Sequence, residues 1–151
     1  MTIDLQEFSL DALAARIVAG SPDAILYSDR EGVIRMWNQG CERIFGFTSA
    51  DAVGQSLEII IPDNLRERHN RGHAETMRTG HTRYGSGDLL SVPALRKDGS
   101  RISVEFSIIP FKDDKGSMIG MAAIMRDVTK RFEEMKELRK LTGRVAGTAR
   151  G

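Results

Sequence analysis

The stretch Arg101-Ile-Ser-Val-Glu-Phe-Ser-Ile-Ile109 decides the fold class, because apolar and polar side chains alternate along it. Successive side chains of a β-strand point to opposite faces of its sheet, so this period of two indicates a strand with one buried and one solvated face. Such a strand needs neighbouring strands and a covering layer, which the rest of the chain must supply.

Four other runs have strand character, and turns that contain glycine accompany them. The first two runs flank the turn at residues 29–32, a pattern typical of a β-hairpin. The third run is interrupted by Pro93, and the fourth follows the turn at residues 113–116. The four predicted strands are residues 24–28, 33–37, 88–95 and 118–125.

Helices are predicted between the second and third strands and near both ends of the chain. The longest internal helix begins near Pro62, a residue that suits a first helical turn, and stops at Gly80. Two strand groups separated by helices predict an α+β fold, with one five-stranded antiparallel sheet and helices on one face. The other face needs shielding by the terminal helices or by a partner. The predicted helices are residues 8–18, 38–46, 50–53, 62–79 and 130–141.

Composition indicates a single globular domain without a charged partner. The 151 residues suit one domain (residues 21–129) between an amphipathic N-terminal helix (residues 1–20) and a closing helix with a frayed tail (residues 130–151). The 22 basic and 21 acidic residues give a net charge of +1, so nothing points to nucleic acid or to an anionic membrane. The single cysteine and the absence of a leader-like or long apolar N-terminal run indicate a cytoplasmic protein.

Several short motifs together resemble the PAS family of sensor domains over residues 17–129. They are Ser21-Pro-Asp-Ala24, Asn38-Gln-Gly-Cys-Glu-Arg-Ile-Phe-Gly46, Val53-Gly54 before Ile61-Pro62, Arg96-Lys-Asp-Gly99 and Arg126-Asp-Val-Thr129. The resemblance implies a five-stranded sheet that cradles a cavity against the long helix, and a final Asp-Val-Thr that couples the sheet to an outgoing signalling helix. PAS domains bind haem, flavin or metabolites, or only dimerise, so the family does not determine the ligand.

His69, on the predicted helix at residues 62–79, is the leading candidate for a cofactor ligand. A neutral imidazole is a good axial ligand for haem iron. The placement of His69 resembles that of the proximal histidine in haem-binding PAS sensors, such as the rhizobial oxygen-sensing kinases and a CO-sensing transcription factor. The resemblance implies haem b with its iron on His69, facing an apolar wall on the following strands. The wall comprises Leu89, Leu90, Val104, Phe106 and Ile108, and Met121 on the last strand is a candidate sixth ligand of the iron.

The expected distal side departs from that of the oxygen-sensing relatives. In those proteins an arginine on the strand after the helix donates a hydrogen bond to the bound ligand, and here the matching place falls near Leu90. An apolar side chain cannot donate this bond. A haem-bound form is therefore expected to favour CO, NO or a redox change over stable O₂ binding.

Other interpretations of the histidines remain open. His73 follows His69 by four residues, so it is a rival haem ligand, and the pair could bind a divalent metal. No third ligand is obviously placed to complete a metal site. Alternatively His69 is solvated, and the chain is a cofactor-free or metabolite-binding dimerisation and interaction module. The methionines of the last strand, Met121 among them, fill an irregular core if they do not bind iron.

Two further classes of function are not supported by the sequence. Flavin–thiol photosensors need a cysteine after the glycine that corresponds to Gly54, and residues 55–58 contain none, while Cys41 lies on an earlier helix as a core residue. The chain has neither a phosphate-binding glycine-rich loop nor a nucleophile elbow, so we expect no catalytic activity and output through a separate protein.

The terminal helices predict a homodimer, because each carries an apolar stripe that one domain would struggle to bury. The stripes are Leu10, Leu13, Ile17 and Val18 on the opening helix, and Phe132, Met135, Leu138 and Leu141 on the closing helix.

Overall fold

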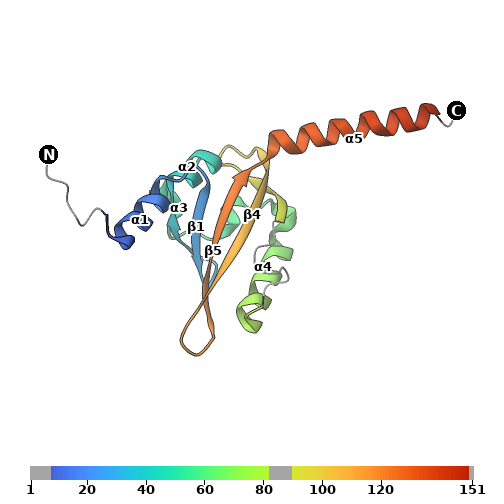
Figure 1. Cartoon of the computed structure of the whole chain (residues 1–151). Helices are drawn as coiled ribbons and strands as arrows, with labels where there is room; N and C mark the ends of the chain where they lie inside the picture. Colours follow the sequence, from blue (N-terminus) through green and yellow to red (C-terminus); the bar gives the residue numbers. More distant parts are fainter. Residues whose placement is uncertain (1–7, 82–89, 150–151) are drawn as a thin grey trace, which may run out of the picture.

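Five strands form one antiparallel sheet in the order β2–β1–β5–β4–β3 (Figure 1). The computed structural model describes the backbone at residues 8–81 and 90–149, and the side chains at residues 8–81 and 90–143. The predicted α+β class and the five-stranded antiparallel sheet are confirmed. The strands are β1 Ala24–Asp29, β2 Ile34–Trp37, β3 Leu90–Leu95, β4 Arg101–Lys112 and β5 Met118–Asp127.

The helices begin and end where the sequence supplies caps. The side chains of Ser9, Asn38 and Thr48 accept hydrogen bonds from the first turns of α1, α2 and α3. Gly46 and Gly80 end α2 and α4 in the left-handed conformation that glycine adopts without strain. The helices are α1 Leu10–Gly20, α2 Gln39–Phe45, α3 Ser49–Ala52, the 3₁₀ helix η2 Leu57–Ile60, α4 Asp63–Thr79 and α5 Thr129–Ala149.

The strand register gives the sheet an inner face, which packs on the helices, and an outer face. Leu26 pairs with Ala123, and Ala123 pairs with Ile108, so these three side chains lie on the inner face. The core between this face and α2, α3 and η2 is apolar and includes Leu26, Trp37, Cys41, Phe45, Leu57, Ile60 and Val104. Burial of these side chains is the main favourable term in folding.

Asn38 joins three elements at one buried point. Its side-chain oxygen accepts hydrogen bonds from the backbone N–H of Ile25 (2.8 Å) and Cys41 (3.0 Å). Its amide nitrogen donates to the backbone oxygens of Val18 (2.8 Å) and Asp23 (3.0 Å). This one side chain therefore fixes α1 and α2 against the start of β1.

Neither terminal helix shields the outer face in the single chain. α1 lies beside α2, and α5 leaves the end of β5 and projects away from the sheet (Figure 1). On the outer face Ile109 is 46% exposed and Phe111 is 41% exposed. The rings of Tyr27 and Phe111 make a T-shaped contact with 5.1 Å between their centroids. Shielding of this face by the terminal helices, as the sequence allowed, is not seen within the described residues.

Several element boundaries differ from the prediction. β4 continues to Lys112, β5 to Asp127 and α5 to Ala149, all beyond their predicted ends. Residues 57–60, for which the sequence predicted no regular element, form η2, whose first turn is capped by Ser56. The part of the predicted third strand before Leu90 lies outside the described residues.

Candidate functional site

The two candidate histidines lie on the side of α4 that faces the domain. Buried or half-buried residues recur along this helix at spacings of three and four, as expected for one helix face. They are Leu65, Arg66, His69, His73, Thr76 and Met77. Only Thr76 and Met77 among them are buried, so the inward face of α4 is mostly polar and packs lightly.

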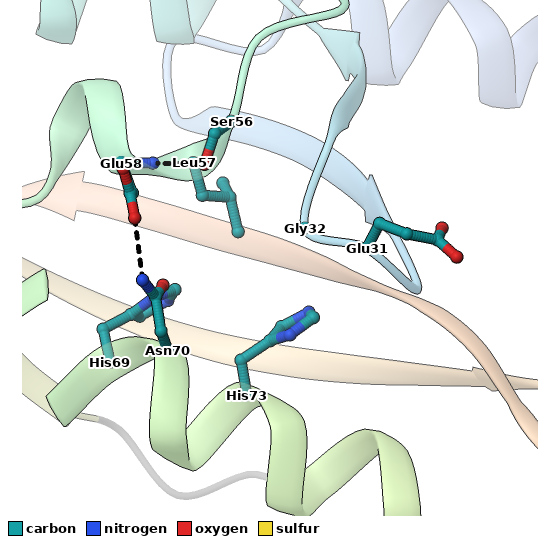
Figure 2. Close-up of a pocket in the computed structure, with 8 residues that line it drawn as sticks. All are labelled: Glu31, Gly32, Ser56, Leu57, Glu58, His69, Asn70 and His73. Carbon is teal, nitrogen blue, oxygen red and sulfur yellow. Dashed lines mark hydrogen bonds between the residues drawn. The ribbon is translucent and has the colours of Figure 1, made fainter. Parts of the chain in front are cut away.

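A hollow of about 250 Å³ lies between α4, η2 and the turn between β1 and β2 (Figure 2). Its walls bring together two imidazoles, two carboxylates, an amide and a hydroxyl. The lining residues are Glu31, Gly32, Ser56, Leu57, Glu58, His69, Asn70 and His73. These groups make the hollow polar and rich in hydrogen-bonding capacity.

His69 belongs to a chain of hydrogen bonds that starts on η2. The amide nitrogen of Asn70 donates to Oε1 of Glu58 at 2.7 Å, as the dashed line in Figure 2 marks. The amide oxygen of Asn70 lies 3.3 Å from Nδ1 of His69. The chain thus links a carboxylate on η2 to one ring nitrogen of the leading candidate ligand.

His73 is the less solvated of the two imidazoles. Its Nε2 is buried and has no hydrogen-bond partner among the described residues. A Cβ atom placed on Gly32 would lie 3.8 Å from its Cε1, so the ring reaches the β1–β2 turn. Burial lowers the pKa of His73, and the charge of nearby His69 lowers it further, against the opposing effect of Asp29 and Glu31. The two rings lie 6.3 Å apart and nearly parallel.

The predicted apolar wall lies on the inner face of the sheet. Leu90 pairs with Phe106, and the register of β4 and β5 places the other wall residues on the same face. Val104 is 2% exposed, whereas Phe106, Ile108 and Met121 are half-buried. None of these side chains lines the hollow. Leu89, the remaining predicted wall residue, lies outside the described residues.

Sequence reasoning did not single out Asn70 and Glu58, the two residues that extend the hydrogen-bond chain from His69. Asn70 is the direct neighbour of His69 in the chain, which is the one signal that could have drawn attention to it. Glu58 lies eleven residues before His69, on a segment whose sequence has no clear periodicity. Only the packing of η2 against α4 brings its carboxylate to the site.

The cysteine, the third histidine and two methionines of β5 do not line the hollow. Cys41 is fully buried, and burial raises the pKa of its thiol to about 12, so it is an unreactive core residue. Met118 and Met125 are buried on β5, and His81 is exposed after α4. Over residues 8–81 and 90–143 no three histidine, cysteine or acidic side chains are grouped as a metal site would require.

The comparison with known families agrees with this architecture, because the model of the PAS domain family matches residues 22–130. The chain belongs to the PAS family. Among curated relatives, the sensor protein FixL of Bradyrhizobium diazoefficiens is 26% identical over 85% of the chain. The oxygen sensor protein DosP of Escherichia coli is 23% identical over 78% of the chain. An uncharacterized protein of Azorhizobium caulinodans is 31% identical over 80% of it.

This PAS domain spans only a fraction of those relatives, namely 16% of the Azorhizobium protein, 25% of FixL and 14% of DosP. Solved structures agree in fold. The PAS domain of a protein from Colwellia psychrerythraea has a TM-score of 0.70 at 24% identity, covering 81% of this chain and 99% of that one. An RNA-binding light-oxygen-voltage receptor has a TM-score of 0.72 at 19% identity, covering 99% of this chain and 41% of the receptor.

No helix within the described part of the chain combines the length and the apolar character that crossing a bilayer demands.

Proposed function

We propose that this PAS sensor domain binds haem b through His69 and responds to a diatomic gas or to redox state. The main support for the proposal is the position of His69 and its contact with Asn70. The imidazole lies on the inward side of α4, and the amide oxygen of Asn70 faces its Nδ1 at 3.3 Å. The other ring nitrogen is left for a metal, as in sites where a histidine binds a metal through one nitrogen and donates the N–H of the other to a polar group.

The inner face of the sheet suits a flat apolar cofactor. Val104, Phe106 and Ile108 succeed one another along β4 on that face, and Leu90 and Met121 flank them on the adjacent strands. Haem bound there would supply an iron that takes up a gas or changes its oxidation state. The protein would supply the axial imidazole and an apolar surface that excludes water.

Haem binding requires α4 to move away from the sheet, with Asn70 of α4 still bonded to Glu58 of η2. The hollow beside the histidines holds about 250 Å³, below the roughly 300–1,000 Å³ of pockets for drug-sized ligands. α4 buries only two of its side chains, and exposed polar contacts such as that of Asn64 with Arg101 (2.6 Å) hold its first turn. An element with so few buried contacts is among the easiest to displace.

The relay to an output protein would pass through the junction of β5 and α5. The backbone N–H of Val128 donates to the oxygen of Ser103, and the hydroxyl of Thr129 accepts from the N–H of Ser103, each at 2.9 Å. These bonds tie the first residues of α5 to β4, which carries part of the apolar wall. A shift of β4 on ligand binding would therefore reach α5 and a partner bound to it.

Similarity to a protein named as an oxygen sensor supports the sensing role, since DosP matches 78% of the chain. Leucine rather than arginine at position 90 favours CO, NO or redox sensing over a stable oxygen complex. Catalysis is not part of this proposal.

Absorption spectroscopy of the purified chain titrated with haem tests the proposal. We expect a strong Soret band in the unmodified protein and in His73→Ala, and its loss or severe weakening in His69→Ala. Reversed behaviour of the two variants would make His73 the ligand. A haem titration without any Soret shift in the unmodified protein would overturn haem binding.

A second candidate function follows from the size and polarity of the hollow. At about 250 Å³, with two carboxylates and two imidazoles in its walls, it suits a small polar metabolite without any rearrangement of α4. A PAS domain of this kind would act as a metabolite-binding or cofactor-free interaction module. It would be colourless, and haem would not raise its thermal stability.

A further inference from the structure

We infer that Glu58, acting through the amide of Asn70, fixes the ring tautomer of His69 so that its Nε2 carries a lone pair instead of a proton. Glu58 and Asn70 are then positioning residues for the metal-binding atom. This inference rests on the proposed function, in which His69 binds iron, but it concerns only the protonation of His69 in the haem-free protein.

The first step is the carboxylate of Glu58, which can only accept hydrogen bonds when it is ionised. Asn70 approaches its Oε1 at 2.7 Å, a distance that requires a donor on Asn70. The side-chain nitrogen of Asn70 must therefore point to Glu58. The opposite orientation would bring two oxygen acceptors together.

Because the side-chain amide of Asn70 is planar, its nitrogen and its oxygen point to different partners. With its nitrogen on Glu58, Asn70 presents its oxygen to Nδ1 of His69 at 3.3 Å. An amide oxygen accepts and cannot donate, so the nitrogen facing it has to carry the proton. A neutral imidazole has one protonated nitrogen, and protonation of Nδ1 leaves Nε2 as the acceptor.

The second histidine, His73, does not contact Nδ1 of His69. Within the described part of the chain the Nε2 of His73 is buried without a hydrogen-bond partner, and its ring lies 6.3 Å from that of His69. His73 therefore does not compete with Asn70 for Nδ1 of His69. The tautomer of His69 on α4 is thus coupled to Glu58 of η2 through Asn70 (Figure 2).

Long-range ¹H–¹⁵N correlation spectra of the haem-free full chain at about pH 8 measure the tautomer, because ordinary histidines, with pKa about 6.5, are neutral there. His69→Gln assigns the signals. We expect the Nδ1–H form for His69 in the unmodified protein and a shift toward the Nε2–H form in Asn70→Ala and Glu58→Ala. Glu58→Gln should retain the Nδ1–H form, because its amide oxygen still accepts from Asn70. The matched control is Glu67→Ala, which removes an exposed carboxylate paired with Arg71 on the same helix.

An Nε2–H tautomer in the unmodified protein, or a tautomer unchanged in Asn70→Ala, would overturn the inference. Haem titration adds an independent readout, since loss of such a supporting hydrogen bond typically weakens metal binding about 10–100-fold. Asn70→Ala should show a loss of that size and Glu58→Gln should show little. If the unmodified protein has the Nδ1–H tautomer but never takes up haem, the inference stands and the proposed function fails.

Discussion

His73 is held as a neutral imidazole by its position beneath the β1–β2 turn. Burial lowers its pKa in the folded state, so the unfolded chain binds the proton more readily, near the ordinary value of about 6.5. The contribution of the neutral His73 ring to the free energy of unfolding is therefore fully present above about pH 6.5. It is lost as the pH falls from about 6.5 toward the lower folded-state pKa.

We expect the free energy of unfolding to fall less steeply with acidification below about pH 6.5 in His73→Leu than in the unmodified protein. Urea unfolding at several pH values measures this slope. The exposed His81 provides the control, because His81→Leu also removes one imidazole but leaves α4 intact. Parallel slopes for the unmodified protein and His73→Leu would contradict the expectation.

Asn38 is the polar side chain whose loss should cost most stability. Asn38→Ala removes the cap of α2 and leaves the N–H of Ile25 and the carbonyls of Val18 and Asp23 without this partner. We expect a loss of about 2–3 kcal/mol from a lost cap plus unsatisfied buried groups. Asn38→Asp keeps the acceptor but not the donor and should be intermediate. Denaturant unfolding checks both, and a loss below about 0.5 kcal/mol for Asn38→Ala would refute this role.

At the residue scale, the sequence identified candidate ligands but not the groups around them. The sequence drew attention to His69 and His73 because imidazole is rare and reactive. Asn70 and Glu58 are common surface residues, and their roles arise from the distance between η2 and α4. That distance depends on tertiary packing, which single-residue reasoning does not reach.

At the scale of elements, periodic patterns predicted well and boundaries less so. β4 was identified by its strict alternation, and α4 by Pro62 at its start and Gly80 at its end. η2 was missed because a single 3₁₀ turn has too few residues for a period. β4 extends beyond its predicted end at residue 109 because it contains Pro110, and a proline normally indicates that a strand has ended.

The junction between β5 and α5 supports a test at this scale. Thr129→Val keeps the side-chain shape but removes the oxygen that accepts from the N–H of Ser103. We expect a loss of about 1 kcal/mol and faster amide exchange at Ser103 and in the first turn of α5, with β1 unchanged. Hydrogen-exchange mass spectrometry measures the difference. Thr142→Val is the matched control, since that hydroxyl bonds only within α5, to Leu138, and equal exchange in both variants would argue against coupling through Thr129.

At the scale of the whole molecule, the sequence predicted which surfaces are apolar but not where they point. α1 buries none of its residues, and Leu10 and Ile17 are 81% and 68% exposed. The direction in which α5 leaves the sheet depends on a few bonds at residues 127–129, so no periodic pattern encodes it. The result is a domain with two terminal helices, each of which carries exposed apolar side chains.

A second copy of the chain is the occupant we expect on these helices. The α5 stripe comprises Phe132, Met135, Leu138 and Leu141, which are 47%, 48%, 56% and 54% exposed. Exposed apolar surfaces of this kind usually mark an interface. Phe132, Met135, Leu138 and Leu141 recur every three residues along α5, so they occupy one side of the helix, which a partner helix can cover.

Phe132→Glu with Leu138→Glu should therefore give a monomer, because four glutamates cannot be buried together between two helices. The sheet and the α4 site lie outside the stripe, so the variant should fold and take up the same ligand. Its melting temperature should equal that of the unmodified protein when both are monomeric. Light scattering at micromolar concentration measures the mass. Lys136→Glu with Lys140→Glu places two glutamates away from the stripe and should remain dimeric. A monomeric unmodified chain would refute self-association and leave both stripes for a different partner.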